Sequence, residues 1–413
     1  MTPKILTTLK TYDRHQFMAD LFAGITVAMV ALPLSLAIAI ASGAEPGTGL
    51  ITAIVAGFLI SALGGSRVQI GGPTGAFIVV VYGVIAAHGY DGLVLATFMA
   101  GFILLAAGVL RAGRLVAHVP ASVVEGFTIG IAVIIATSQI KDFLGLSLDH
   151  QPAEFLEKLP ALWAARGSFN AAAFGVALLA MGLIIGLRRA APRLPGLIVA
   201  VALASGLVAL LGLDVDTIQS RFGDLPDSLP RPAIPAISAA RLWELLPSAL
   251  VIAFLAGIES LLSAMVADRM IGGRHRPDAE LTAQGSANIA SALFGGLPAT
   301  GAIARTATNV KAGGLTPVAG IIHALTILLV MLLAAPLAGY LAMPALAALL
   351  MLTAWNMSEP QKWPAYLRAP PADRLLLFGT MILTVLVDLT VAIGAGVAAG
   401  LMIRLIGRWR RGS

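Results

Sequence analysis

Two charged residues, Glu259 and Arg305, lie in stretches of sequence that are otherwise apolar. An ionisable side chain inside a membrane helix costs roughly 2.5 to 3.5 kcal/mol unless it is paired or hydrated, so such residues indicate function. A buried carboxylate can carry a proton near neutral pH, and an arginine supplies a fixed positive charge for an anion. Glu259 is therefore the candidate proton carrier and Arg305 the candidate anion ligand. The alternative is a structural Glu259–Arg305 pair, and the two roles can coexist.

A short motif recurs in the two halves of the chain. The sequence reads GPTGA over 72–76 and PATGA over 298–302, and each copy opens a short apolar segment. If the halves have opposite orientations, the two segments begin near mid-membrane with their N-termini facing each other. Helix N-termini present unpaired N–H groups and partial positive charge, which bind anions. The alternative is that both motifs are tight turns between ordinary helices. The predicted substrate site comprises Thr74, Gly75, Ala76, Phe77, Gly301, Ala302, Ile303, Ala304, Arg305 and Thr306.

The helices that position such a site must lie in the lipid bilayer. Of the 413 residues 58% are hydrophobic and 12% charged, and the mean hydropathy is +0.91. A soluble domain needs about 25% charged residues, so an ordinary soluble enzyme is excluded. The net charge of +6 does not indicate nucleic-acid binding, because the sequence contains no compact basic run with interleaved aromatic residues. The composition predicts an all-α membrane protein with many helices.

Apolar segments divide the chain into two groups of seven. About 20 apolar residues cross a bilayer as a helix. The segments lie near 21–42, 48–64, 74–88, 93–110, 120–140, 171–187, 195–213, 246–267, 281–297, 302–310, 317–335, 337–357, 375–390 and 391–407. We expect fourteen transmembrane segments in two inverted repeats, 1–213 and 214–413. Twelve crossings with two re-entrant loops are the alternative.

The basic residues predict how the chain is oriented. With the N-terminus inside, most of the 27 lysines and arginines fall in cytoplasmic segments, as the positive-inside rule requires. The first apolar run continues for about twenty residues without a small-residue cleavage pattern, so it reads as a transmembrane helix and not as a signal peptide. We expect a multi-pass protein with both termini in the cytoplasm.

Catalytic and cofactor chemistry find little support in the sequence. Cysteine is absent, the six histidines are scattered, and no phosphate-binding loop of the GxxxxGK[ST] type occurs. No acid–base pair, nucleophile or metal-ligand cluster stands out at membrane depth. We therefore expect no enzyme, metal or cofactor. Three hypotheses remain: a proton-coupled anion transporter, an uncoupled channel or exchanger in which Glu259 is structural, and an intramembrane enzyme.

Three stretches carry a resemblance to a known family. They are 20–24 running into 31–33, the glycine-proline motif at 71–74, and LPATGAIARTATNVKAGGLTPVAG from Leu297 to Gly320. Together they resemble the sulfate permease (SulP) family, solute carrier family 26, over residues 1 to about 410. Within that family, 257–262 and 354–358 look most similar to the bacterial branch of C4-dicarboxylate transporters.

The resemblance implies a uracil-permease-like fold. Segments 1–4 and 8–11 would form a core domain and segments 5–7 and 12–14 a gate, with an anion site between the half-helices of segments 3 and 10. It further implies an elevator mechanism, a homodimer and a place in the bacterial inner membrane. Family members usually continue into a cytoplasmic sulfate transporter and anti-sigma factor antagonist (STAS) domain, which we expect this chain to lack because the sequence stops at Ser413.

Arg305 matches the family arginine and Thr306 the hydroxyl after it. Ala304 departs from the family pattern, where many members have serine, and Leu34 stands where many have glutamine. The sequence-based prediction is secondary active transport, as proton-coupled symport of a small organic dianion such as fumarate or succinate. The alternative is an inorganic anion, either sulfate, bicarbonate, chloride or nitrate, moved by a transporter, exchanger or channel of the same fold. The expected partners are the anion, protons and the lipid bilayer.

Overall fold

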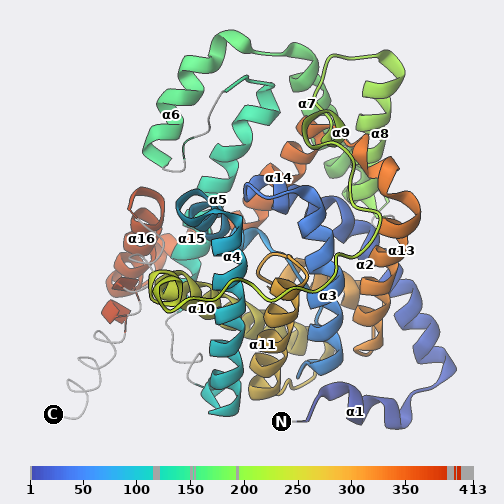
Figure 1. Cartoon of the computed structure of the whole chain (residues 1–413), viewed down its shortest axis with the longest axis vertical. Coiled ribbons are helices and arrows are strands. Elements are labelled where there is room, and N and C mark those ends of the chain that lie inside the picture. Colours follow the sequence, from blue (N-terminus) through green and yellow to red (C-terminus); the bar gives the residue numbers. More distant parts are fainter. Residues whose placement is uncertain are drawn as a thin grey trace.

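The computed structural model describes residues 2–114, 121–148, 152, 155–191, 195–387, 395–396 and 398–400, and these are mostly helical (Figure 1). The first half contains α1 (Lys4–Thr8), η1 (Leu9–Thr11), α2 (Arg14–Ala41), α3 (Pro46–Leu63), β1 (Gly71–Gly72), η2 (Gly75–Phe77), α4 (Ile78–Val109), η3 (Ala112–Arg114), α5 (Ala121–Leu144), α6 (Phe155–Ala164), η5 (Ala165–Ser168), α7 (Ala171–Ala190) and α8 (Gly196–Leu211). The second half contains α9 (Ile218–Phe222), α10 (Ala239–Ile271), α11 (Pro277–Leu293), β2 (Thr300–Gly301), α12 (Ile303–Lys311), α13 (Val318–Gly339), α14 (Met343–Met357), η6 (Pro360–Lys362), α15 (Trp363–Arg368) and α16 (Pro371–Leu386).

Seven of the described helices are long and apolar enough to cross a membrane, namely α2, α3, η2 with α4, α5, α7, α10 and α13. Each expected segment from 21–42 to 375–390 overlaps a helix, and 74–88 and 93–110 both overlap α4. The last expected segment, 391–407, lies almost wholly outside the described residues. The all-helical membrane fold is therefore confirmed, while the fourteen crossings and their inverted repeat stay predictions.

Helices α4 and α12 differ from a regular helix that spans the membrane without interruption. Helix α4 contains a break at Gly89, whose φ of +72° suits glycine, and the break separates the expected segments 74–88 and 93–110. Helix α12 has nine residues, so its length of about 13 Å is less than half of a bilayer core of about 30 Å. It therefore begins or ends inside the membrane if its axis follows the membrane normal.

Helix packing falls into two groups. Helix α11 packs along α4 and α3, α13 along α2 and α3, and α10 against α4 and α12. In the second group, α5 packs against α14 and α16, and α14 also packs against α7. Helix α2 contacts both groups through α8 and α14. The expected division into a core domain and a gate domain stays a prediction.

Buried carboxylates fix loops of the first group. Asp20 is fully buried and accepts hydrogen bonds from the backbone N–H groups of Leu315 (2.8 Å) and Thr316 (3.0 Å) as well as from the Thr316 hydroxyl. Glu280, also fully buried, accepts from Gly65 N (2.8 Å). Each carboxylate joins parts of the chain that are more than 200 residues apart.

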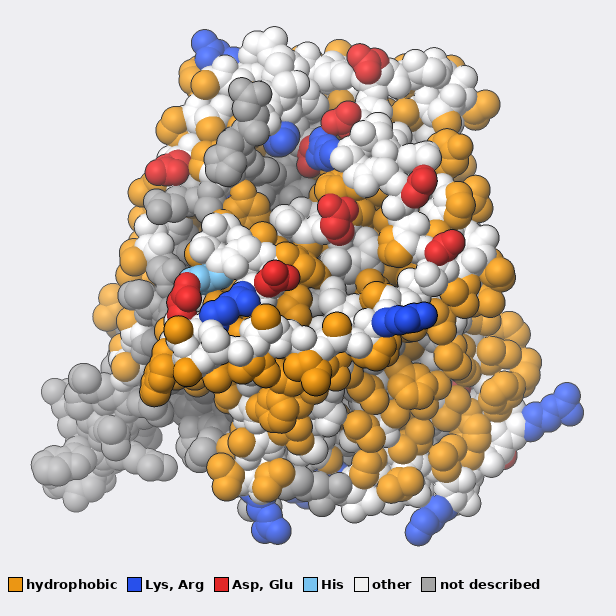
Figure 2. Space-filling view, in the orientation of Figure 1, with side chains coloured by type: hydrophobic (Ala, Val, Ile, Leu, Met, Phe, Trp, Pro, Cys, Tyr) orange, Lys and Arg blue, Asp and Glu red, His pale blue; other side chains and the backbone are white. Residues whose placement is uncertain are grey.

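The visible face of the molecule has an apolar part and a charged part. In Figure 2 hydrophobic side chains cover most of the lower part of the visible face, and charged side chains gather above them around a hollow. Large apolar residues such as Leu210 and Leu333 are 85% and 75% exposed. Apolar exposure on this scale fits a surface in contact with lipid.

Candidate functional site

The two recurring motifs meet in space. Strands β1 and β2 pair antiparallel, with Gly71 opposite Gly301 and Gly72 opposite Thr300. Helix η2 begins three residues after β1, and α12 begins two residues after β2. Because the strands run in opposite directions, the helices that follow them leave this joint in opposite directions. The structure thus brings together both sets of residues that the sequence singles out.

Glycine is needed at the joint for steric reasons. A Cβ atom on Gly301 would lie 1.6 Å from Gln69 Nε2. Gly72 has a φ of +148°, and a Cβ there would lie 2.4 Å from Arg305 Nη1. The missing side chains let the two strands approach and leave room for the guanidinium.

The two helices start without side-chain caps. Thr74 precedes η2 and Ala302 precedes α12, and neither side chain accepts a hydrogen bond from its helix. The first N–H groups of a helix have no acceptor within it and carry partial positive charge. In α12 these groups belong to Ile303, Ala304 and Arg305, of which the first two are exposed. The residues that begin α12 are thus accessible, and their N–H groups have no acceptor within the helix.

Arg305, the third residue of α12, is buried. Its side chain is 1% exposed, and Nη2 donates to Ser35 Oγ (3.1 Å) and to the Pro73 carbonyl (3.0 Å). Nε and Nη1 have no hydrogen-bond partner among the described residues. Buried donors are normally satisfied, and a buried charge without partners is costly. The two unused donors are thus available to a ligand or water.

Glu259 is joined to the opposite half-helix. Thr74 Oγ1 donates a hydrogen bond of 2.9 Å to Glu259 Oε2. The carboxylate is half-buried, and within the described part of the chain it forms no direct ion pair with Arg305. A change of protonation at Glu259 would therefore act on the residue that begins η2.

The other residues of the predicted substrate site that follow are buried or half-buried. Thr306 is fully buried, and its hydroxyl accepts from Ile70 N (3.1 Å) and contacts Ser263 Oγ (3.2 Å). Ala302 N donates to the Ile70 carbonyl (2.8 Å). Both residues hold α12 in place, and their predicted contact with substrate stays untested. In η2, Gly75 and Phe77 are buried and Ala76 is half-buried.

Sequence reasoning missed several polar neighbours of the site. Ser35 on α2 contacts Arg305 across 270 positions of sequence, and Gln69 donates to Ser260 Oγ (2.8 Å). Only Ser35 carried a signal, since it follows Pro33 in an apolar helix. His323, one of the scattered histidines, is fully buried in α13, with both ring nitrogens unpartnered among the described residues.

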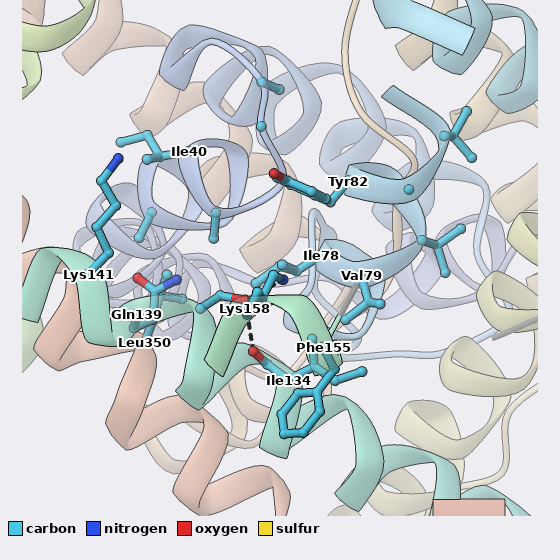
Figure 3. A pocket seen from close by; sticks show the side chains of 18 of the residues that line it. Ile40, Ile78, Val79, Tyr82, Ile134, Gln139, Lys141, Phe155, Lys158 and Leu350 are labelled. Carbon is cyan, nitrogen blue, oxygen red and sulfur yellow. Dashed lines mark hydrogen bonds between the residues drawn. The ribbon is translucent and has the colours of Figure 1, made fainter. Parts of the chain in front are cut away.

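A cavity of about 570 Å³ lies between the two helix groups (Figure 3). We call it the α6 cavity because α6 contributes Phe155 and Lys158 to its lining. It reaches Ile78 and Val79 in the first turn of α4, but none of the predicted substrate-site residues lines it. Among the described residues, no group of three or more histidine, aspartate or glutamate side chains is placed to hold a metal.

Comparisons with known proteins agree on one family. The profile of the sulfate permease family matches residues 17–380. The chain is 43% identical to the putative sulfate transporter YvdB of Bacillus subtilis, over 96% of this chain and 74% of that protein. It is 32% identical to the bicarbonate transporter BicA of a Picosynechococcus species, over 92% of this chain and 68% of that protein.

Solved structures show the same fold. The transmembrane domain of a cyanobacterial bicarbonate transporter BicA superposes with a TM-score of 0.83, at 32% identity over 92% of this chain and 98% of that one. The murine anion transporter Slc26a9 in the inward-facing state gives a TM-score of 0.88 at 17% identity, over 98% of this chain and 71% of that one.

Proposed function

The chain belongs to the sulfate permease family of anion transporters, and we propose that it carries a small inorganic oxyanion, bicarbonate or sulfate, across the membrane. The observation that carries this proposal is the β1–β2 joint, which places the uncapped starts of η2 and α12 beside a buried arginine with two unused donors. The anion would bind there, between the two half-helices.

The single cluster of donors at the joint favours a compact anion. A C4-dicarboxylate carries two carboxylates several ångströms apart, and each needs its own donors. Around the joint, the described residues provide one buried cation, Arg305. The relatives described as sulfate or bicarbonate transporters support the same choice. The inorganic alternative from the sequence is therefore better supported than the fumarate or succinate reading.

We further propose that Glu259 couples transport to a proton gradient. Its carboxylate accepts from Thr74, the residue before η2, so its charge acts directly on one wall of the proposed anion site. An anion nearby favours a protonated Glu259, and a protonated Glu259 in turn favours the anion, because such coupling is reciprocal. The finer expectations of an elevator movement between the helix groups, and of a homodimer, rest on the family resemblance.

The test is uptake into proteoliposomes across a panel of anions at two pH values. We expect bicarbonate or sulfate to accumulate and an inward proton gradient to increase that accumulation. Accumulation of fumarate or succinate without either inorganic anion would overturn the substrate assignment. Uptake that is independent of the pH gradient would overturn the coupling and leave an exchanger or channel.

A further inference from the structure

Helix α6 turns a lysine inward and apolar residues outward. Lys158 is 4% exposed and Leu162, one turn later, is 7% exposed, so this face of the helix is buried. On the opposite face Leu156 and Trp163 are 58% and 68% exposed. A helix at a membrane surface normally directs lysine to water. The reversed arrangement keeps a cation inside the α6 cavity, where burial is costly.

The protein leaves part of the Lys158 ammonium group available. Nζ donates to Ser138 Oγ on α5 (3.0 Å) and lies 5.2 Å from the ring centre of Tyr82 on α4. An ammonium has three N–H donors, and the described residues supply an acceptor for one and an aromatic face for another. No carboxylate among the described residues forms an ion pair with it. Figure 3 shows Lys158 with Ile78, Val79 and Ile134 around it.

The other charges that line the cavity do not neutralise Lys158. Arg221 on α9 is held by Asp142 (2.8 Å) and by Asp216 (2.7 Å), so that cation and the Asp142 carboxylate offset each other. Lys141 lies at the edge of the residues drawn in Figure 3. Two further charged residues line the cavity: Glu45 is exposed, and His88 pairs with Glu244 (2.9 Å).

We propose that the α6 cavity is a second anion-binding site, in which the Lys158 ammonium and its neighbours hold a small oxyanion before it reaches the β1–β2 joint. The cavity lies on the side that the charge pattern predicts to be outside, and its inner end reaches the first turn of α4, directly after η2. An anion entering from outside would thus meet Lys158 first. The pathway to the joint rests on the proposed function, whereas binding at Lys158 does not.

The pKa of Lys158 agrees with this placement. Burial lowers it to about 8, because no nearby negative charge compensates for the lost hydration. A bound anion would restore that compensation and stabilise the protonated form.

The binding test is titration calorimetry of the full chain in nanodiscs, with sulfate and then bicarbonate as the probes at pH 7 and constant ionic strength. We expect two sites in the parent and one in Lys158→Met. The Arg305→Ala variant should keep the Lys158 site, and the double variant should bind neither anion. Arg166→Met, which removes an exposed cation of η5 that does not line the cavity, is the matched control and should bind like the parent. Unchanged stoichiometry in Lys158→Met for both anions overturns the proposal.

Transport measurements distinguish a binding role of Lys158 from a structural role. For uptake from the α6 side we expect Lys158→Met to raise KM about tenfold, the effect of losing one charged contact, with Lys158→Arg retaining most of the affinity. A lower Tm with unchanged KM in Lys158→Met would make Lys158 a structural link between α5 and α4, and would overturn the site. Loss of transport in Arg305→Ala with sulfate binding at Lys158 retained distinguishes the two sites.

Discussion

Arg305 is the largest of the fully buried side chains in the described part of the chain. Its Nη2 is anchored to α2 and to the Pro73 carbonyl, while Nε and Nη1 have no protein acceptor there. A guanidinium that served only to hold the fold would be expected to use its donors fully. The partial use of this group is the reason for placing the substrate beside it.

Replacing Arg305 with alanine should reduce uptake by about a hundredfold or more, since a buried charged contact to the anion is lost. Arg305→Lys should recover little, because an ammonium cannot reach Ser35 and the anion together. Uptake into proteoliposomes is the measurement. Lys311→Ala, an exposed cation on the same helix, is the control and should transport normally. Substrate affinity that survives in Arg305→Ala removes this residue from the site.

Glu259→Gln keeps a neutral group beside Thr74 and removes the titratable proton. We expect it to retain anion exchange and to lose accumulation driven by an inward pH gradient. Glu244→Gln, on the same helix but at its exposed beginning, is the control. Gradient-driven accumulation equal to that of the parent would show that Glu259 is structural.

The pH dependence of uptake from the α6 side should report Lys158. Because burial lowers the pKa of this lysine to about 8, its charge is present below pH 8 and is lost as pH rises through that value. The KM for sulfate should therefore rise between pH 7 and pH 9.5. Lys158→Arg stays charged, so its KM should stay flat. The groups facing Lys158, namely Tyr82, Ser138 and the Arg221–Asp142 pair, are the same in both proteins. Parallel profiles for the two proteins contradict the assignment.

At the scale of single residues, the sequence identified Glu259 and Arg305 because each is a charged residue in an apolar stretch. It did not identify Ser35 as a partner of Arg305, or Gln69 as a partner of Ser260, since those contacts join positions far apart in the chain. In the sequence Lys158 is only one of 27 basic residues. Its importance comes from burial, which no local pattern encodes.

The β1–β2 joint depends on Gly301. An alanine there would place its Cβ 1.6 Å from Gln69 Nε2, and such overpacking costs about 1 to 3 kcal/mol. We expect Gly301→Ala to lower the Tm and to abolish uptake. Shortening the obstructing side chain in Gly301→Ala/Gln69→Ala should restore part of both. Gly175→Ala on α7, which has open space around it and lies outside the α6 cavity, should behave like the parent. A normal Tm and normal uptake in Gly301→Ala would show that the joint is not tight.

The positions of the helices could be predicted from the sequence, but the strand pairing and the helix break between them could be predicted only in part. Apolar runs located the expected segments to within several residues, and the recurring Thr-Gly-Ala sequence predicted two short helices facing each other. The strand pairing of Gly71 with Gly301 was not foreseen, because two-residue strands have no periodicity. The bend at Gly89 was represented only as a gap between segments.

The orientation of the whole molecule can be tested by cysteine labelling, since the chain contains no cysteine. Ser228→Cys should react with an impermeant reagent from outside, and His15→Cys only from inside. Both positions are exposed. The buried positions Ser42 and Gly65, which the loop prediction alone would offer, are poor choices for the same test. Reversed labelling would invert the predicted topology and place the α6 cavity on the cytoplasmic side.

Family and fold class could be predicted from the sequence, whereas the substrate could not. The stretch from Leu297 to Gly320 was long and specific enough to identify the family, which the family profile confirms. The choice of a dicarboxylate rested on short matches at 257–262 and 354–358. The relatives YvdB and BicA are themselves described as a putative sulfate transporter and a bicarbonate transporter. Backbone donors and one arginine distinguish such anions weakly. Few residues of the sequence therefore depend on which anion is carried.

The β1–β2 joint also has a consequence for biosynthesis. Gly71 cannot meet Gly301 until the ribosome has added the intervening residues, which takes about ten seconds or more at 5 to 20 residues per second. Until then the backbone of β1, and the Gly65 N–H that later donates to Glu280, have no partner in the nascent chain. Unpaired backbone is unfavourable in lipid. A polypeptide released after its first half would therefore remain incomplete at its centre, and we expect membrane proteases to recognise and degrade it.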